Sequence, residues 1–382
     1  MRLTLLAIGS RGDVQPLVAL GVGLQRHGHH VRVVAGDEFD GLVADAGLEF
    51  TPLGVNIRTV IESHTNIFHL IESIRTLVLK ASAEAQDAIV STFLGVSACP
   101  LARERHVPFF YAVPIPGLET REFPHLLFPR LPLGKAYNAL TYRLADHQVT
   151  HSCPDARCLF LEPRPTYLFC FSSHVVPRPA DWEEYAHVTG YWFLDRPADW
   201  QPPAELEQFL QAGAPPVYVG FGSARTNDPQ KMTALVVEAL ARAGQRGVLV
   251  AGWGGLQTGA LSADVFAAPA LPFDWLFPRV SVAVHHGGAG TTAEALRAGV
   301  SSVVVSLAMD RVFWGWQLHK LGAGTAPIAP RYLTAEHLAA AIRQAATDPQ
   351  LHANAAALGE KIRREDGVGN AVAIIEKVIQ SK

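Results

Sequence analysis

Hydrophobic residues along the chain gather in short continuous runs, and each run is followed by glycine and then by a longer amphipathic stretch. The first run covers residues 3–8 and leads into a glycine turn at 9–13, a helical pattern over 16–27 and a second run at 30–36. A continuous apolar run of this length is typical of a strand buried on both faces, and strand, helix and strand in this order form a βαβ unit. The start of the chain therefore predicts a parallel sheet covered by helices.

The same order of elements returns in the second half, after a segment at 196–216 that is rich in Pro and Ala. Immediately after this segment, PVYVGFGSA has the pattern of a strand and a glycine turn. The elements expected next are a helix over 232–243, strands over 247–252, 281–286 and 301–306, and a last helix over 370–379. We expect an α/β protein with two Rossmann-like, doubly wound domains that face a central cleft, and a C-terminal helix that returns to the first domain.

The expected domain boundaries follow from these repeats. The N-terminal domain is expected over 1–198, a linker over 199–215, the C-terminal domain over 216–364, and the returning helix over 365–382. A chain of 382 residues agrees with this division, because a length of about 150 residues per domain suggests two domains. The linker and the return crossing near residue 365 are the hinges that we expect.

Composition narrows the class of protein. Hydrophobic residues make up 49% of the chain and charged residues 18%, which suits sheets buried on both faces. The net charge of −3 leaves no basic footprint for nucleic acid. The sequence has no apolar run of about twenty residues that would span a membrane, and its first run is too short for a signal peptide. We expect a cytoplasmic protein, as a monomer or a homodimer.

Four cysteines occur, at Cys99, Cys153, Cys158 and Cys170. They have no paired CxxC spacing and no accompanying histidine pattern that would indicate a metal site. Reduced thiols are the simplest interpretation.

The most informative motif is HHGGAGTTAEALRAG, which runs from His285 to Gly299. A run of strand length precedes it, and its second half is helical in composition, so the glycines lie where a helix begins. Unpaired backbone N–H groups and the positive end of the helix dipole attract an anion there, and glycine lets the backbone approach it closely. The motif predicts a phosphate site, although many α/β proteins need glycine in such a turn for structural reasons alone.

Four segments together resemble a known family. They are GSRGDVQPLVALGVGLQRHGHHVRVVAG near the start, FGS at 221–223, FDWLFPRVSVAVHHGGAGTTAEALRAGV, and MDRVFWGWQLHKLGAG. In this order they resemble the inverting GT-B glycosyltransferases that use nucleotide sugars, above all the bacterial enzymes that modify antibiotics and the sterol glucosyltransferases. The resemblance implies transfer of a hexose or deoxyhexose from a UDP- or dTDP-sugar to a hydroxyl of a hydrophobic acceptor, such as a natural product, a phenol or a sterol-like molecule.

The resemblance assigns the catalytic base to Asp13. An inverting transfer needs a carboxylate that takes the proton of the acceptor hydroxyl as this attacks the anomeric carbon. Asp13 follows the first predicted strand, at the edge where open α/β sheets bind ligands. The alternative for Asp13 is an N-cap of the next helix.

The leaving diphosphate needs its charge stabilised, and no acidic DxD metal motif occurs, so we expect neither a metal nor another cofactor. Helix N-termini and neutral donors are expected to take that role. The residues assigned to the donor are Gly12, Ser223, His286, Gly288, Ala289, Gly290 and Thr291.

Three further residues are assigned to the nucleoside. Glu294 stands where many relatives have a carboxylate that bonds the ribose hydroxyls, and Asp274 and Trp275 open the segment that shapes their base pocket. Glu294 could instead be an ordinary exposed helix residue, and Trp275 could be part of the core.

Asp310 and Arg311 stand where glucosyl-transferring relatives have Asp followed by Gln, a pair that contacts the sugar. A guanidinium cannot accept a hydrogen bond and favours a carboxylate or a phosphate. Either the donor sugar is not plain glucose, or Arg311 turns away to pair with a local carboxylate.

The acceptor region is expected over 56–145, which has many aromatic residues and an irregular pattern apart from the helical apolar spacing over 67–79. His64, Phe68 and Phe110 are its candidate contacts, although most aromatic residues in this stretch must fill the core.

Two other functions stay open at this point. A sugar-nucleotide epimerase of the same two-domain shape would also bind a UDP-sugar. An auxiliary protein that has kept the fold and lost the chemistry is the second alternative, since a fold is a safer inference than an activity.

Overall fold

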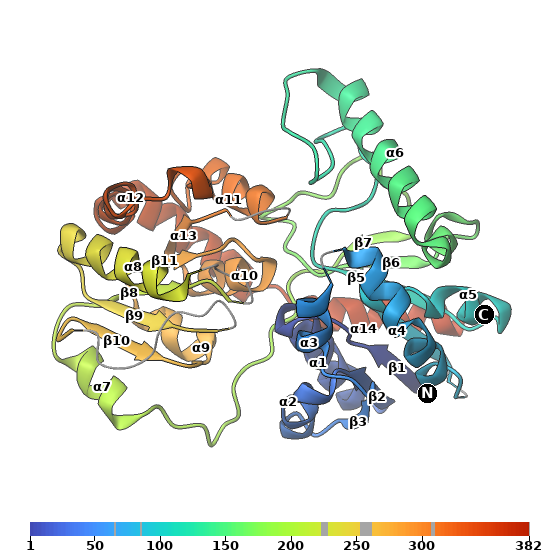
Figure 1. Cartoon of the computed structure of the whole chain (residues 1–382). Helices are drawn as coiled ribbons and strands as arrows, with labels where there is room; N and C mark the ends of the chain where they lie inside the picture. The colour runs from blue at the N-terminus through green and yellow to red at the C-terminus, as the bar shows by residue number, and fades with distance from the viewer. Residues whose placement is uncertain (65, 85, 223–227, 253–261, 307–309, 382) are drawn as a thin grey trace. The chain divides into compact units, whose positions relative to one another are not determined.

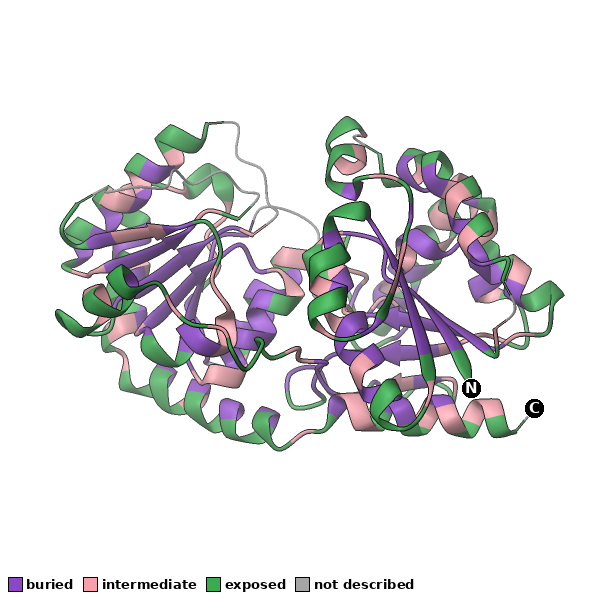
Figure 2. Ribbon diagram, turned by 90° about the horizontal axis from the view of Figure 1, so that it is seen from below, coloured by how far each residue is buried: buried purple, intermediate pink, exposed green. Residues whose placement is uncertain are grey.

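The computed structural model describes residues 1–64, 66–84, 86–222, 228–252, 262–306 and 310–381. The chain divides into two compact units, Met1–Leu194 with Glu365–Lys382, and Asp195–Arg364. Each unit is built on one parallel sheet, with helices before and after its strands (Figure 1). Figure 2 colours most strand residues of both sheets as buried, as expected for sheets covered on both faces.

The first unit contains a seven-stranded sheet in the order β3-β2-β1-β4-β5-β6-β7, and every neighbouring pair is parallel. Its strands are β1 (Arg2–Leu6), β2 (His30–Ala35), β3 (Glu49–Pro52), β4 (Ala88–Ser91), β5 (Phe109–Val113), β6 (Thr166–Phe169) and β7 (Ala186–Val188). Its helices are α1 (Arg11–Arg26), α2 (Asp40–Asp45), α3 (Ile57–Ser63), α4 (Ile67–Ala81), α5 (Ala98–Glu104), α6 (Gly134–Ser152) and α14 (Gly367–Gln380). The strand order reverses its direction between β1 and β4, which is the switch point where open α/β sheets bind ligands.

The second unit contains a five-stranded parallel sheet in the order β10-β9-β8-β11-β12. Its strands are β8 (Val217–Gly220), β9 (Gly247–Val250), β10 (Val265–Ala268), β11 (Val282–His285) and β12 (Ser301–Val304). Its helices are α7 (Ala204–Gln211), α8 (Pro229–Ala243), α9 (Phe273–Leu276), α10 (Ala289–Ala298), α11 (Asp310–Lys320), α12 (Ala335–Thr347) and α13 (Pro349–Arg363). Successive residues of its strands alternate between two cores: Val217 and Val219 pack on one face and Tyr218 on the other. Helix α7 lies within the segment that the sequence suggested as a linker.

The C-terminal helix α14 packs against α1, which confirms that the end of the chain returns to the first unit. Gly23 of α1 makes this approach close, because a Cβ at that position would collide with Val368 of α14. His29 also contacts Glu376, with 2.9 Å between Nε2 and Oε1, and Asn370 donates to the Thr189 carbonyl at 2.9 Å.

The structure confirms the helix expected over 67–79, which is α4, and corrects the expectation that the rest of residues 56–145 is irregular. This stretch supplies α3, α4, α5 and two central strands, β4 and β5. Both strands are short and every residue in them is buried, so they lack the alternation of polar and apolar positions that reveals a longer, half-exposed strand. Within the described residues, no helix is long and apolar enough to cross a membrane.

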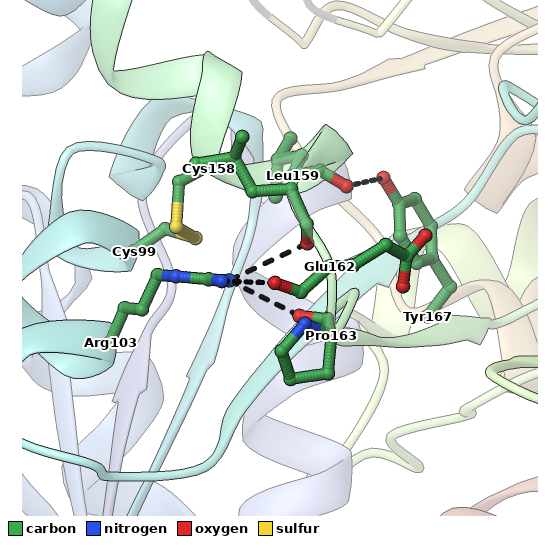
Figure 3. Close-up of a disulfide and its surroundings, with 8 residues drawn as sticks. Cys99, Arg103, Cys158, Leu159, Glu162, Pro163 and Tyr167 are labelled. Atoms are coloured by element: carbon green, nitrogen blue, oxygen red, sulfur yellow. Dashed lines mark hydrogen bonds between the residues drawn. A yellow bond between two sulfur atoms is a disulfide. The ribbon is translucent and has the colours of Figure 1, made fainter.

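The structure also corrects the expectation of four reduced cysteines. Cys99 of α5 and Cys158 form a disulfide, with 6.0 Å between their Cα atoms, while Cys153 and Cys170 are buried free thiols. Cys158 lies in a 3-10 helix, Pro154–Phe160. Figure 3 shows the guanidinium of Arg103 beside this disulfide, where it donates to the carbonyls of Leu161, Glu162 and Pro163. The two cysteines are 59 residues apart in sequence, so only the packing of α5 brings them together.

We predict that protein purified without reductant contains two titratable thiols of its four cysteines when it is unfolded in denaturant. Reduction should raise the number to four and lower the melting temperature, because it opens a loop whose closure restricts the unfolded chain. Thiol titration with and without reductant checks this, and four thiols before reduction would contradict the pairing.

Candidate active site

The motif at His285–Gly299 lies at the switch point of the second sheet, between β8 and β11. His285 ends β11, His286 to Gly288 form the turn, and Ala289 begins α10. Gly287 has a φ of +85°, a backbone conformation that favours glycine, and its N–H donates to His285 Nδ1 at 3.1 Å. Gly288 is the N-cap of α10 and carries no side chain to cap it. The first N–H groups of α10 therefore lack the side-chain acceptor that most helix starts have.

The imidazole of His286 fits between two glycines. A Cβ at Gly222, just after β8, would lie 2.7 Å from His286 Cε1, and a Cβ at Gly288 would collide with His286 Nε2. A larger residue at either position would displace the ring. The local sequence thus holds this histidine at the carboxyl edge of the sheet, beside the start of α10.

Both histidines of the motif are neutral at physiological pH. Burial lowers the pKa of each to about 3, and the pKa of His286 is lowered further by His285 and by the charge of Arg311. Nδ1 of His286 and the hydroxyl of Thr292 are buried with no hydrogen-bond partner in the described part of the chain, and Thr291 is also buried. An unpaired buried polar atom costs about 1–3 kcal/mol, so a ligand that pairs with it gains binding energy.

Glu294 lies in the second turn of α10 and is 8% exposed. Burial raises its pKa to about 7, with Arg297 opposing the shift and Asp274 and Asp195 adding to it. The alternative of an exposed helix residue is therefore excluded. Glu294 borders an open cavity of about 850 Å³ in the second unit, together with Asp274 and Trp275.

The other two nucleoside candidates have partners within the protein. Asp274 pairs with Arg196, with 2.5 Å between Oδ2 and Nη1. Trp275 is 5% exposed, and its ring lies 5.3 Å from that of Trp200 and 4.6 Å from the guanidinium carbon of Arg279. These neighbours match the alternative that Trp275 is a core residue. Ser223 lies outside the described residues.

Asp310 and Arg311 form the start of α11. Both side chains are partly exposed, and the Arg311 backbone lies against Gly287. Arg311 makes no ion pair with a carboxylate in the part of the chain that the structure describes, so the alternative of a local carboxylate partner finds no support there.

In the first unit, Asp13 lies in the first turn of α1, at the switch point between β1 and β4. Its Oδ2 accepts hydrogen bonds from the backbone N–H of Ser10 at 2.8 Å and from the Ser10 hydroxyl at 2.9 Å. The N-cap is Ser10, not Asp13, and α1 starts at Arg11, five residues earlier than the sequence pattern suggested. Gly9, with a φ of +144°, leaves the space that the carboxylate occupies. Gly12 is exposed within α1.

The surroundings of Asp13 make it a stronger base than a surface carboxylate. Burial raises its pKa, and the hydrogen bonds from Ser10 oppose that shift without cancelling it. Its charge in turn adds to the burial that raises the pKa of Tyr111 in β5 and of Cys170, which reaches about 12. Tyr111 and Cys170 are buried, and the half-buried Asp13 lies close enough for its charge to act on both.

The acceptor candidates differ in their surroundings. His64 ends α3, where its Nδ1 lies 2.9 Å from the Val60 carbonyl, and Phe68 in α4 is partly exposed. Phe110 is 0% exposed inside the sheet, so packing accounts for it. Exposed apolar side chains gather instead near α6, at Leu127, Leu131, Leu133, Leu140 and Leu144. Only the spacing of Leu133, Leu140 and Leu144 on one face of a helix could have indicated this surface from the sequence.

Residues 3–107 match the N-terminal domain of glycosyltransferase family 28, and residues 249–372 match the C-terminal domain of the erythromycin biosynthesis protein CIII-like family. Two Arabidopsis thaliana sterol 3-beta-glucosyltransferases are similar over the whole chain. UGT80A2 is 34% identical over 100% of this chain and 66% of its own length, and UGT80B1 is 33% identical over 97% and 67%. The chain belongs to the GT-B glycosyltransferases.

Solved structures agree on the fold of this glycosyltransferase. The glycotransferase of kitacinnamycin has a TM-score of 0.73 at 21% identity, over 98% of both chains. The Streptomyces sp. SF2575 glycosyltransferase SsfS6, complexed with thymidine diphosphate, has a TM-score of 0.65 at 22% identity, over 99% of both chains. The chain spans about two thirds of the plant relatives and 27% of the Cryptococcus neoformans sterol 3-beta-glucosyltransferase.

We predict that Gly288→Ala weakens binding of a nucleoside diphosphate to this glycosyltransferase about tenfold, as expected for the loss of one strong hydrogen bond. The backbone at Gly288 has a φ of −66°, which alanine adopts freely, so the effect should come from displacement of the His286 ring. Calorimetric titration measures the affinity, and thermal unfolding checks that the fold is kept.

The matched control is Gly41→Ala, in a helix where an added Cβ meets no atom within 4 Å. It should bind the nucleotide as the wild type does. Unchanged affinity of Gly288→Ala would show that the position of the His286 ring does not matter for the ligand.

Proposed function

We propose that this glycosyltransferase moves a hexose or deoxyhexose from a UDP- or dTDP-sugar to a hydroxyl of a hydrophobic small molecule, with inversion, without a metal, and with Asp13 as the general base. The turn at His286–Gly288 carries the proposal. It combines a helix start without a side-chain cap, a buried histidine nitrogen that has no partner among the described residues, and glycines that make room for the histidine ring. These are the requirements of a phosphate site, and the phosphate of a nucleotide sugar fits the family.

In the proposed reaction, the acceptor hydroxyl attacks the anomeric carbon while Asp13 takes its proton. The bond from the anomeric carbon to the diphosphate breaks, and the negative charge that develops on the diphosphate is stabilised by the N–H groups at the start of α10 and by His286. Because His286 is neutral, its ring N–H can donate a hydrogen bond to the diphosphate, and the imidazole carries no extra proton that the departing product could take. Gly288, Ala289, Gly290 and Thr291 contribute the backbone of this site, and Glu294 is assigned to the ribose hydroxyls.

The class of acceptor rests on two observations. The leucines near α6 leave an exposed apolar surface on the unit that carries Asp13, and such surfaces commonly bind apolar partners. The relatives with the names quoted above act on sterols, and the solved structures include enzymes of natural-product glycosylation. A sterol-like or polyketide-like acceptor fits both.

We predict that Asp13→Asn keeps nucleotide binding and lowers the turnover of glycosyl transfer about 10²- to 10⁴-fold, the usual contribution of a general base. Asparagine retains an oxygen that accepts the Ser10 N–H, so the start of α1 stays intact while the proton acceptor is lost. Transfer from UDP- and dTDP-sugars to a panel of sterols and phenols, with a chelator present, measures the effect.

Ser10→Ala is the control, because it removes one hydrogen bond to Asp13 and keeps the carboxylate. It should retain most of the activity. Near wild-type turnover of Asp13→Asn would contradict the assignment of the base. Conversion of the sugar nucleotide without any acceptor would favour an epimerase, and binding without turnover on every acceptor would favour an auxiliary protein.

A further inference from the structure

Helices α10 and α11 begin at the same edge of the second sheet. They contact each other, and the turn before α10 lies against the start of α11: a Cβ at Gly287 would lie 2.7 Å from the Arg311 carbonyl oxygen and 2.8 Å from Val304 Cγ1. Arg311 is the second residue of α11. Its position in the chain thus places it beside the turn that holds His286.

The positive potential at this edge has more than one source. The start of each helix contributes about half an elementary charge, which the carboxylate of Asp310 in the first turn of α11 opposes at that helix. The charge of Arg311 is close enough to lower the pKa of His286, after burial and His285. No carboxylate among the described residues forms an ion pair with Arg311, and the segments 223–227, 253–261 and 307–309 contain no Asp or Glu in the sequence.

The surroundings of His286 favour a ligand at this edge. His286 is 7% exposed, and its Nδ1 is buried without a partner among the described residues. The neutral imidazole of His286 can form a hydrogen bond with one group of a ligand, but it cannot balance the positive charge of the Arg311 guanidinium. An anion that reaches both side chains would satisfy His286 and Arg311 together.

We propose that Arg311 binds an anionic oxygen of the donor that lies beyond the first phosphate: an oxygen of the distal phosphate or of a carboxylate on the transferred sugar. A guanidinium has five N–H donors and no acceptor, and its planar fork matches both groups with two parallel hydrogen bonds. A sugar hydroxyl would leave its charge without a counterpart. This inference rests on the proposed function, because it places the first phosphate at the start of α10.

The test compares wild type, Arg311→Gln and Arg311→Lys by calorimetric titration in the presence of a chelator. The ligands are UMP, UDP, UDP-glucose and UDP-glucuronic acid, or the thymidine series if wild type prefers it. Lys320→Gln is the matched control, because Lys320 is an exposed cation at the other end of α11. It removes the same charge and should leave every affinity unchanged.

If Arg311 meets the distal phosphate, Arg311→Gln should weaken UDP and both UDP-sugars about tenfold and leave UMP unchanged. If it meets a sugar carboxylate, wild type should prefer UDP-glucuronic acid to UDP-glucose, and the substitution should remove that preference and leave UDP unchanged. In both cases, Arg311→Lys should recover only part of the loss, because it restores the charge and not the fork.

Equal affinities of Arg311→Gln and wild type for all four ligands would overturn the inference and leave the proposed function standing. Equal weakening of UMP and UDP would also overturn it, because Arg311 would then act on the first phosphate or on the fold. A wild type that binds no nucleoside diphosphate at all would instead contradict the proposed function. Thermal unfolding of each variant separates loss of the site from loss of the fold.

Discussion

The candidate site in the second unit depends on close contacts that only glycine allows, between the turn before α10, the His286 ring and the start of α11. Gly222 and Gly288 leave room for the His286 ring, and Gly287 lets the start of α11 lie against the turn. Side chains at these positions would move the imidazole, the start of α10 or the start of α11. These three glycines therefore fix the positions of His286, of Arg311 and of the starts of α10 and α11. The neighbouring strands β11 and β12 are buried, and among the described residues they offer His286 Nδ1 no polar partner.

The helices that begin at the two switch points, α1 and α10, differ in whether a side chain supplies an acceptor at their start. In the first unit, the carboxylate of Asp13 accepts the Ser10 N–H and hydroxyl, so the start of α1 already has its anion. In the second unit, Gly288 leaves the start of α10 without a side-chain cap. Each turn follows a strand next to the switch point of its sheet. A carboxylate with a raised pKa on one unit and a helix start without a side-chain cap on the other suit the inverting transfer that we propose.

Much of this could be predicted from the sequence, because it depends on local patterns. The apolar runs with their glycine turns indicated both sheets, and the motif at His285–Gly299 indicated the strand, turn and helix start at the switch point of the second sheet. The sequence could not indicate the Cys99–Cys158 pair, because helix packing brings together residues that are 59 positions apart. It also misplaced the start of α1, because Pro16 suggested a helix start while the Ser10–Asp13 hydrogen bonds begin the helix earlier. Whether Trp275 and Phe110 line a site or fill the core depends on their tertiary contacts, which the residue type alone does not indicate.

Hydrogen exchange measured by mass spectrometry, with and without UDP or dTDP and with a chelator, tests the central claim most directly. The account predicts slower exchange of the amides at 287–291 when the nucleotide is added, because the uncapped start of α10 gains its acceptor. It also predicts no change at the start of α1, where Asp13 already supplies one. Unchanged exchange at 287–291 under saturating nucleotide, or protection confined to the first unit, would contradict the account.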